Sequence, residues 1–246
     1  MSLLKKEAGV VLKRARSGSA SSIVTMLGAE SGKIKLMAKG ARTKDSPFRG
    51  SLEPGSIIEA VYYFKERREI YFLRETAILT GPPPGAASLQ ALSARLAALE
   101  LVDQICYPGD PDRAVWELIV SYLRTGRAAD PLVLFLAFEV KLLGALGVLP
   151  EFHLCAECGA PVARGRYDPA NGMSFCERER TAGGELMPLD GALLDVLDRA
   201  GHAGLQELAG LELSDSVRKR FGLLLHWTYT YHVQGYRVPN SLKLLK

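Results

Sequence analysis

The chain has 246 residues, of which 48 % are hydrophobic and 24 % charged, with a formal net charge of +4. This length and composition allow one large or two small domains with a well-buried core. The sequence contains no apolar run of about eighteen residues, and its N-terminus is too charged for a signal peptide. These features exclude a helical membrane protein and predict a cytoplasmic one.

Positive charge is concentrated in residues 1–80. That segment holds fifteen Lys and Arg against eight Asp and Glu, a local charge of +7, so the remaining 166 residues sum to −3. The same segment has the period-two pattern of β-strands, with Gly/Ser-rich turns between five short runs, at residues 9–14, 22–27, 33–39, 56–64 and 70–74. Five short strands predict a small OB-type barrel, and a segregated basic surface on it predicts binding to phosphate backbones.

Alternation along the strands predicts which side chains face out. In 33–39, both Lys33 and Lys35 lie opposite Ile34 and Leu36, which must be buried. The last two strands are rich in aromatic residues, and at most one face of each strand is exposed to water. We therefore expect most of these aromatic side chains in the core (Tyr62, Tyr63, Phe64, Tyr71 and Phe72).

The run at 81–85, Gly-Pro-Pro-Pro-Gly, predicts a boundary between domain 1–80 and domain 81–246. The second domain has mainly helical periodicity. Its predicted helices begin at Ser88, near Asp112, at Asp130-Pro131, at Ala192 and at Ser214 or Asp215. Between about 153 and 184 the periodicity fails, which marks a compact irregular insertion. The fold class is therefore α+β, with a barrel followed by a helical domain.

The insertion contains a cysteine cluster. Cys155 and Cys158 form a Cys-x-x-Cys knuckle, and Cys176 begins a second knuckle in which Glu179 stands where a fourth cysteine is expected. Glu179 or His153 supplies the fourth zinc ligand, or the ribbon folds without metal. The site has no open, water-bearing position of the kind that catalytic zinc requires.

The loop at 39–50 is the main candidate for contact with nucleic acid. Its glycines allow close backbone approach, its cations can meet successive phosphates, and Phe48 could stack on a base. Cations elsewhere on the barrel extend this surface. The predicted binding residues are Arg14, Lys33, Lys35, Lys39, Arg42, Lys44, Phe48, Arg49 and Lys65.

No catalytic constellation is present in the sequence. Cys106 lies in an apolar helical context and is expected to be a buried small side chain, and no phosphate-binding Gly-x-x-x-x-Gly-Lys-Ser/Thr loop occurs. The aromatic residues of the last helix have the spacing of a core-facing stripe. We therefore do not expect an enzyme.

Several segments resemble the RecO family of bacterial recombination mediators in DNA repair. The similarity covers nearly the full length, and it departs at Glu179, where the family has its last cysteine. The segments that carry it are Gly9–Leu12, Ser21–Thr25, Gly32–Ile34, Ala38–Arg42, Phe48–Pro54, Val61–Tyr63, Phe138–Leu143, Leu146–Gly147, Pro150, and Cys155 through Gly159.

The resemblance implies a function without catalysis. It implies binding of single- and double-stranded DNA, annealing of complementary strands, and loading of the RecA recombinase together with RecR on DNA coated by single-strand-binding protein. It also implies a nucleoid-associated protein whose helical domain docks the acidic C-terminal tail of single-strand-binding protein. For this tail, the cluster Arg218-Lys219-Arg220 beside apolar Val217 and Phe221 is one candidate, against the alternative of a solvated helix start.

Two other functions remain open from the residues. An RNA-binding OB module would use the same basic surface and would prefer single-stranded RNA. A metal-dependent hydrolase would show nuclease activity that chelation abolishes.

Overall fold

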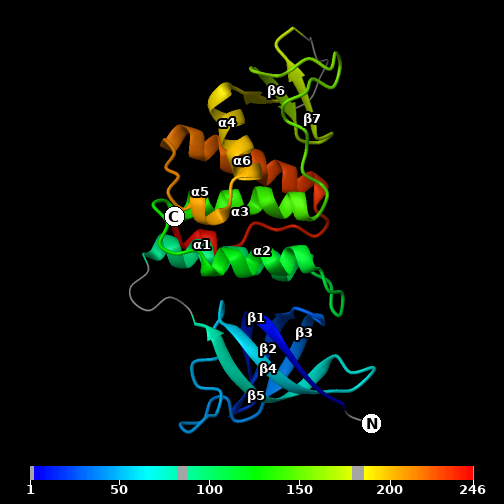
Figure 1. Ribbon diagram of the computed structural model, residues 1–246, viewed down its shortest axis with the longest axis vertical. Coiled ribbons are helices and arrows are strands. Elements are labelled where there is room, and N and C mark those ends of the chain that lie inside the picture. The colour runs from blue at the N-terminus through cyan, green and yellow to red at the C-terminus, as the bar shows by residue number, and fades with distance from the viewer. Residues whose placement is uncertain (1–2, 82–87, 179–185, 246) are drawn as a thin grey trace. The chain divides into compact units, whose positions relative to one another are not determined.

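The computed structural model describes residues 3–81, 88–178 and 186–245 (Figure 1). Two compact units make up the chain: a barrel unit of residues 1–124 and 239–246, and a helical unit of residues 125–238. The expected boundary run at 81–85 lies, apart from Gly81, outside the described residues. By contacts, the first two helices group with the barrel and not with the helices that follow.

Five strands close the barrel, as predicted for an OB-type domain. They are β1 (Leu3–Ser17), β2 (Ser21–Gly28), β3 (Gly32–Ala38), β4 (Ile57–Phe64) and β5 (Ile70–Thr80). Their order around the barrel is β1-β2-β3-β5-β4 (Figure 1), and only the β3–β5 pair is parallel. Both β1 and β5 extend beyond the predicted runs because their ends continue to pair with β4.

The barrel interior is filled by the alternate, inward-facing residues of each strand. Ile34 and Leu36 are buried as predicted, while Lys35 between them is exposed. Side chains from the β3–β4 loop close the core together with the strands. The core comprises Val11, Val24, Met26, Ile34, Leu36, Ala38, Ala41, Phe48, Leu52, Ile58, Ala60, Tyr62 and Leu73.

One buried carboxylate, Glu7, organises the β2–β3 turn. Tyr62 Oη donates to Glu7 Oε1 at 2.5 Å, and the backbone N–H groups of Glu30 and Ser31 donate to Glu7 Oε2 at 2.9 and 3.1 Å. A buried charge costs little when donors surround it in this way. Burial, together with the bond to Glu7, raises the pKa of Tyr62 well above its ordinary value, so the phenol keeps its proton.

Two helices and a short C-terminal turn complete the barrel unit. Ser88 caps α1 (Leu89–Ile105), as predicted, by accepting from the N–H of Ala91 at 3.1 Å. Asp112 likewise accepts from the N–H of Val115 at the start of α2 (Arg113–Arg124). The 3-10 helix η1 (Asn240–Leu245) was not predicted; the Glu100 carboxylate on α1 accepts from its first residues, Asn240 N at 2.6 Å and Ser241 N at 3.2 Å.

The helical unit is built around an apolar helix, α3 (Pro131–Ala145). Asp130 caps it, with Pro131 in the first turn, as predicted. Helices α4 (Gly191–His202) and α6 (Asp215–His232) pack against it, and the short α5 (Leu205–Leu208) lies between them in the chain (Figure 1). Ser214 caps α6 as predicted. Neither α5 nor the full length of α4 was predicted.

The irregular insertion forms a small sheet in the helical unit. Its strands are β6 (Gly165–Asp168), β7 (Met173–Cys176) and β8 (Met187–Leu189), in the order β7-β6-β8. Tyr167 of β6 is fully buried and its hydroxyl lies 3.1 Å from that of Thr228 on α6, which ties the sheet to the helices. Among the described residues, no helix is long and apolar enough to cross a membrane.

Candidate nucleic-acid interface and cysteine cluster

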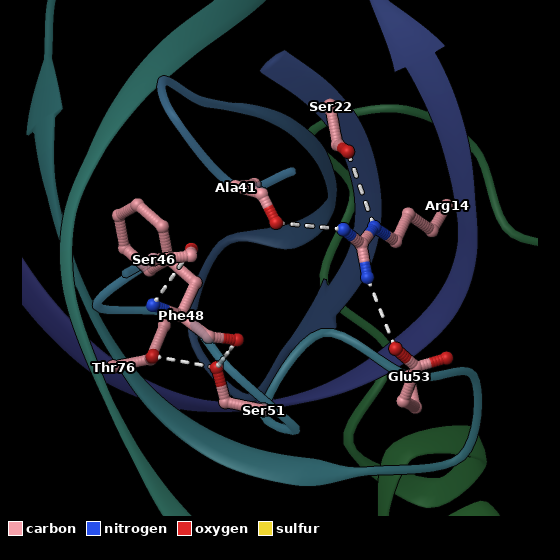
Figure 2. Close-up of polar contacts among 8 residues, drawn as sticks. All are labelled: Arg14, Ser22, Ala41, Ser46, Phe48, Ser51, Glu53 and Thr76. Carbon is pink, nitrogen blue, oxygen red and sulfur yellow. Dashed lines mark hydrogen bonds and ion pairs between the residues drawn. The ribbon is translucent and has the colours of Figure 1, made fainter. Parts of the chain in front are cut away.

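The β3–β4 loop, residues 39–56, is held against the barrel by Arg14 (Figure 2). Its guanidinium donates to Ser22 Oγ at 3.1 Å, to the carbonyl oxygen of Ala41 at 3.0 Å and to Glu53 Oε1 at 3.0 Å. The guanidinium carries its donors on three separate nitrogens of a rigid planar fork, so it can meet all three acceptors at once. The charge of Arg14, one of the predicted binding residues, is therefore engaged by acceptors of the protein itself.

Phe48 anchors the middle of the same loop (Figure 2). Its ring is 4 % exposed and belongs to the barrel core. Ser46 Oγ accepts from its N–H, and its carbonyl oxygen accepts from Ser51 Oγ, which also bonds Thr76 Oγ1 at 2.8 Å. A ring packed in the core offers no face to a base. The apolar residue at this position closes the barrel, and the prediction that it stacks on a base does not fit its burial.

Lys33 also has an internal role. Its Nζ donates to the backbone carbonyl oxygen of Asp103 at 2.5 Å, and the carboxylate of Asp103 pairs with Lys13 at 2.6 Å. The Lys33 side chain is 15 % exposed. Next to it, Gly32 has a φ of +64°, and a Cβ there would lie 2.4 Å from the carbonyl oxygen of Asp110. This corner of the barrel is closely packed against the segment that follows α1.

The remaining predicted cations are exposed. Arg42 reaches the β1–β2 turn, where it donates to the carbonyl oxygen of Gly18 at 3.2 Å, and the Nζ of Lys39 lies 4.6 Å from the ring centroid of Phe72. In the part of the chain that the structure describes, no acidic side chain forms an ion pair with any member of this group. We call the group the basic surface: Lys35, Lys39, Arg42, Lys44, Arg49 and Lys65.

Two aromatic side chains on the outside of the barrel were not among the predicted site residues. Tyr63 is 43 % exposed and Phe72 is 37 % exposed, whereas their neighbours Tyr62 and Leu73 point into the core. Strand alternation could have indicated their exposure, because successive residues of β4 and β5 face opposite sides of the sheet. Composition alone could not separate the inward from the outward rings.

The three cysteines of the insertion come together as predicted. Their sulfur atoms all lie within 4.8 Å of one another, and the Sγ atoms of Cys158 and Cys176 are 3.8 Å apart. The backbone N–H groups of Cys158 and Cys176 lower the pKa of Cys155 to about 7, whereas the neighbouring Cys155 sulfur raises the pKa of Cys158 to about 11. The thiolate that a metal requires is therefore favoured first at Cys155.

The fourth ligand is not supplied by the described residues. No histidine or carboxylate of residues 3–81, 88–178 or 186–245 joins the three sulfurs, so the structure does not bring His153 to the cluster. The other candidate, Glu179, lies outside the described residues. Three thiolates in knuckle geometry are a donor set that suits zinc.

At the start of α6, the two arginines of the basic cluster are paired within the helical unit, while Lys219 is exposed. Arg218 pairs with Asp130 at 2.8 Å and with Asp215 at 2.6 Å, and Arg220 pairs with Asp190 at 2.5 Å. The neighbouring Phe221 is fully buried. The arginines therefore hold the cap residues of α3 and α4, an arrangement that argues against a peptide site on these two side chains and differs from a merely solvated helix start.

Comparison with known proteins agrees with the architecture. The family pattern described as "Recombination protein O N terminal" matches residues 1–82, and "Recombination protein O C terminal" matches residues 86–241. The chain belongs to the RecO family. RecO proteins are DNA repair proteins by name, so the family assignment supports a role in repair and not an enzymatic activity.

Several curated RecO proteins are similar over most of their length. The DNA repair protein RecO of Myxococcus xanthus (strain DK1622) is 32 % identical over 227 residues, which cover 91 % of this chain and 90 % of that protein. The RecO of Anaeromyxobacter dehalogenans (strain 2CP-C) is 31 % identical over 212 residues, 85 % of this chain and 84 % of the relative. The RecO of Exiguobacterium sp. (strain ATCC BAA-1283 / AT1b) is 26 % identical over 237 residues, 95 % and 91 % of the two chains.

Proposed function

We propose that this RecO-family protein binds single- and double-stranded DNA through the basic surface of its barrel and anneals complementary strands. The observation that carries the proposal is the set of six exposed cations that have no acidic partner among the described residues. Exposed cations without acidic partners are available to displace counterions from phosphates. Cations that the barrel needs for its own structure, such as Arg14 and Lys33, are excluded from this set.

We further propose that the protein acts as a mediator. In this role it works with RecR to load the RecA recombinase onto DNA coated by single-strand-binding protein, and it contacts the acidic tail of that protein through the helical unit. Family membership and the similarity to DNA repair proteins support this role. Because Arg218 and Arg220 are already paired, the tail would bind elsewhere on the helical unit.

The decisive experiment is strand annealing. Two complementary labelled oligonucleotides are mixed with the full chain, with and without saturating single-strand-binding protein, and duplex formation is followed by energy transfer. We expect faster annealing in both cases. Acceleration of naked strands alone would remove the mediator role, and no acceleration in either case would contradict the proposal as a whole.

A competition experiment separates DNA from RNA. Unlabelled single-stranded RNA of the same length and sequence competes against a labelled DNA strand bound to the protein. We expect DNA to compete at lower concentration. The reverse order would favour an RNA-binding module that uses the same cations.

The cysteine cluster would hold a structural zinc ion. Cys155, Cys158 and Cys176 would be its ligands, with Glu179 proposed as the fourth. Bound there, the ion would cross-link the knuckle that precedes β6 to the end of β7, so its contribution would be to folding.

A further inference from the structure

A row of exposed apolar side chains crosses four strands of the barrel. Leu4 on β1 is the cross-strand partner of Tyr63 on β4, Tyr63 is the partner of Phe72 on β5, and Phe72 is the partner of Met37 on β3. Leu4, Tyr63 and Phe72 are 45 %, 43 % and 37 % exposed, and Met37 is half-buried. Directly paired residues share one face of a sheet, so these four side chains form a continuous outer strip.

Single exposed apolar residues are ordinary on protein surfaces, whereas a contiguous strip of them marks a site of interaction. Its two central members are aromatic, and each stands between inward-facing neighbours that fix the strand. Tyr62 beside Tyr63 is fully buried and bonded to Glu7, and Leu73 beside Phe72 lies in the core. The rings are therefore held facing outward by the same alternation that builds the core.

Cations flank this strip. Lys35 lies two residues before Met37 on β3 and therefore faces the same way, about 6.6 Å along the strand. Lys39 and Lys65 are the first residues after β3 and β4, two positions beyond Met37 and Tyr63. Lys39 already lies over the Phe72 ring, 4.6 Å from its centroid. An aromatic ring with an ammonium group beside it is complementary to a nucleotide, because the ring can stack on the flat base and the ammonium can pair with the anionic phosphate.

We infer that Tyr63 and Phe72 are the base-stacking residues of the barrel, and that single-stranded DNA lies across the Leu4–Tyr63–Phe72–Met37 strip with its phosphates on Lys35, Lys39 and Lys65. This inference rests on the proposed function and specifies its contact residues. Stacking of bases on aromatic side chains is tolerant of sequence, which suits a protein that must bind any strand. Lys39 would leave the ring for a phosphate as a base covers Phe72, because a charge-assisted contact is stronger than an exposed cation–π contact.

The test compares an oligo-dT strand with an abasic strand of the same length and charge. The wild-type chain is expected to bind oligo-dT more tightly, and the double variant Tyr63→Leu/Phe72→Leu to lose about tenfold to a hundredfold in affinity for oligo-dT. Its affinity for the abasic strand should stay within about twofold, because the lysines remain. Tyr107→Leu, a change at an aromatic residue that is 62 % exposed outside the strip, is the matched control and should alter neither affinity.

The outcomes separate the inference from the proposed function. A wild-type chain that binds neither strand would contradict the proposed function. A wild-type chain that binds both, with a double variant that behaves like it, would overturn the inference alone. In the same way, a double variant that binds DNA normally but changes its oligomeric state in light scattering would assign the strip to contact between copies of the chain.

A second variant covers the case in which the double variant fails to fold. Tyr63→Trp keeps an aromatic face and adds a fluorophore at the strip. We expect oligo-dT, but not the abasic strand, to quench its emission beyond the change seen in the wild-type chain, which has only Trp116 and Trp227. Equal quenching in the two proteins would overturn the inference.

Discussion

The guanidinium of Arg14 donates to the backbone carbonyl oxygen of Ala41 at 3.0 Å, and this contact joins β1 to the loop that carries Arg42, Lys44 and Arg49. A cation near the basic surface thus acts on the protein's own backbone. Its role is to fix the loop, and three of the exposed cations depend on that loop for their position.

Replacement of Arg14 by Lys should therefore loosen the loop without changing the charge. A lysine cannot meet Ser22, Ala41 and Glu53 together, so we expect the free energy of unfolding of the barrel to fall by about 1–2 kcal/mol. Chemical denaturation measures the loss, and proteolysis within 39–56 should become faster. Arg16→Lys, at an exposed position of the same strand, is the control. Equal stability of the two variants would show that the three contacts contribute little.

Removal of four loop-side cations should reduce the salt dependence of binding. In the variant with Lys39, Arg42, Lys44 and Arg49 replaced by Ala, the magnitude of the negative slope of log K against log salt concentration should decrease by about 2 to 3. Each phosphate contact in a single strand contributes about 0.7 to that magnitude. Fluorescence anisotropy between low and moderate salt gives the slope. Arg199→Ala/Lys219→Ala, which removes exposed charge from the helical unit, should leave it unchanged. An unaltered slope in the fourfold variant would exclude the loop from contact with the backbone of DNA.

Substitution of Phe48 should affect stability and not stacking. Phe48→Ala removes a buried ring and is expected to cost about 3–5 kcal/mol of unfolding free energy, whereas Phe48→Leu should cost about 1–2 kcal/mol. In the leucine variant, affinity for oligo-dT at a temperature where it is folded should equal that of the wild-type chain. A selective loss of affinity there would show that the ring leaves the core to meet a base.

The cysteine cluster should bind at most one zinc ion per chain, and the ion should matter for folding. Elemental analysis of protein purified without chelators gives the stoichiometry. The triple variant Cys155→Ser/Cys158→Ser/Cys176→Ser should lose the metal and destabilise the β6–β7–β8 sheet, while the barrel keeps its affinity for DNA. Glu179→Gln tests the fourth ligand by weakening zinc affinity. Zinc-loaded wild-type protein that unfolds like the metal-free wild type and the triple variant would show that packing alone holds the sheet.

Stability of the helical unit should fall as pH rises. Burial raises the pKa of Glu139, in the middle of α3, to about 8. Because the folded state then holds a proton that the unfolded chain releases near pH 4 to 5, this contribution is complete below about pH 4 and is lost as pH rises through about 8. The slope is at most about 1.4 kcal/mol per pH unit.

Urea denaturation between pH 5 and 9 measures this dependence. Burial and, next, the charge of Glu139 raise the pKa values of Tyr229 and Tyr236, so both tyrosines stay neutral in this range. Glu139→Gln should flatten the profile, while Glu207→Gln at an exposed position should not. A profile of wild-type protein as flat as that of Glu139→Gln would show that Glu139 is ionised in the fold.

Much of the fold could be predicted because local rules and tertiary packing agree. Ser88, Asp130 and Ser214 cap the helices that they were expected to cap, and the alternation around Ile34 and Leu36 matches the barrel core. The short η1 was not predicted, because the distant carboxylate of Glu100 accepts from the backbone of its first residues. Its formation depends on a contact between residues that are far apart in the sequence.

The candidate site was predicted less fully, because residue type does not report which partner a side chain finds. Arg14, Lys33 and Lys35 are alike in the sequence, yet the first two are bound to acceptors of the protein and only Lys35 is exposed. Phe48 and Phe72 likewise exchange their expected roles, since one fills the core and the other faces outward. These assignments needed the register of the barrel, which is a property of several strands at once.

The contact of Glu100 with Asn240 and Ser241 has a consequence for biosynthesis. The barrel unit draws its last piece from residues 239–246, after the whole helical unit has been translated. During translation, the five strands and two helices of the barrel unit emerge first, but the carboxylate of Glu100 stays without these donors until Asn240 and Ser241 have followed. A change at Asn240 or Ser241 would thus be felt in the first unit made, and the barrel unit cannot complete its contacts before the helical unit has been synthesised.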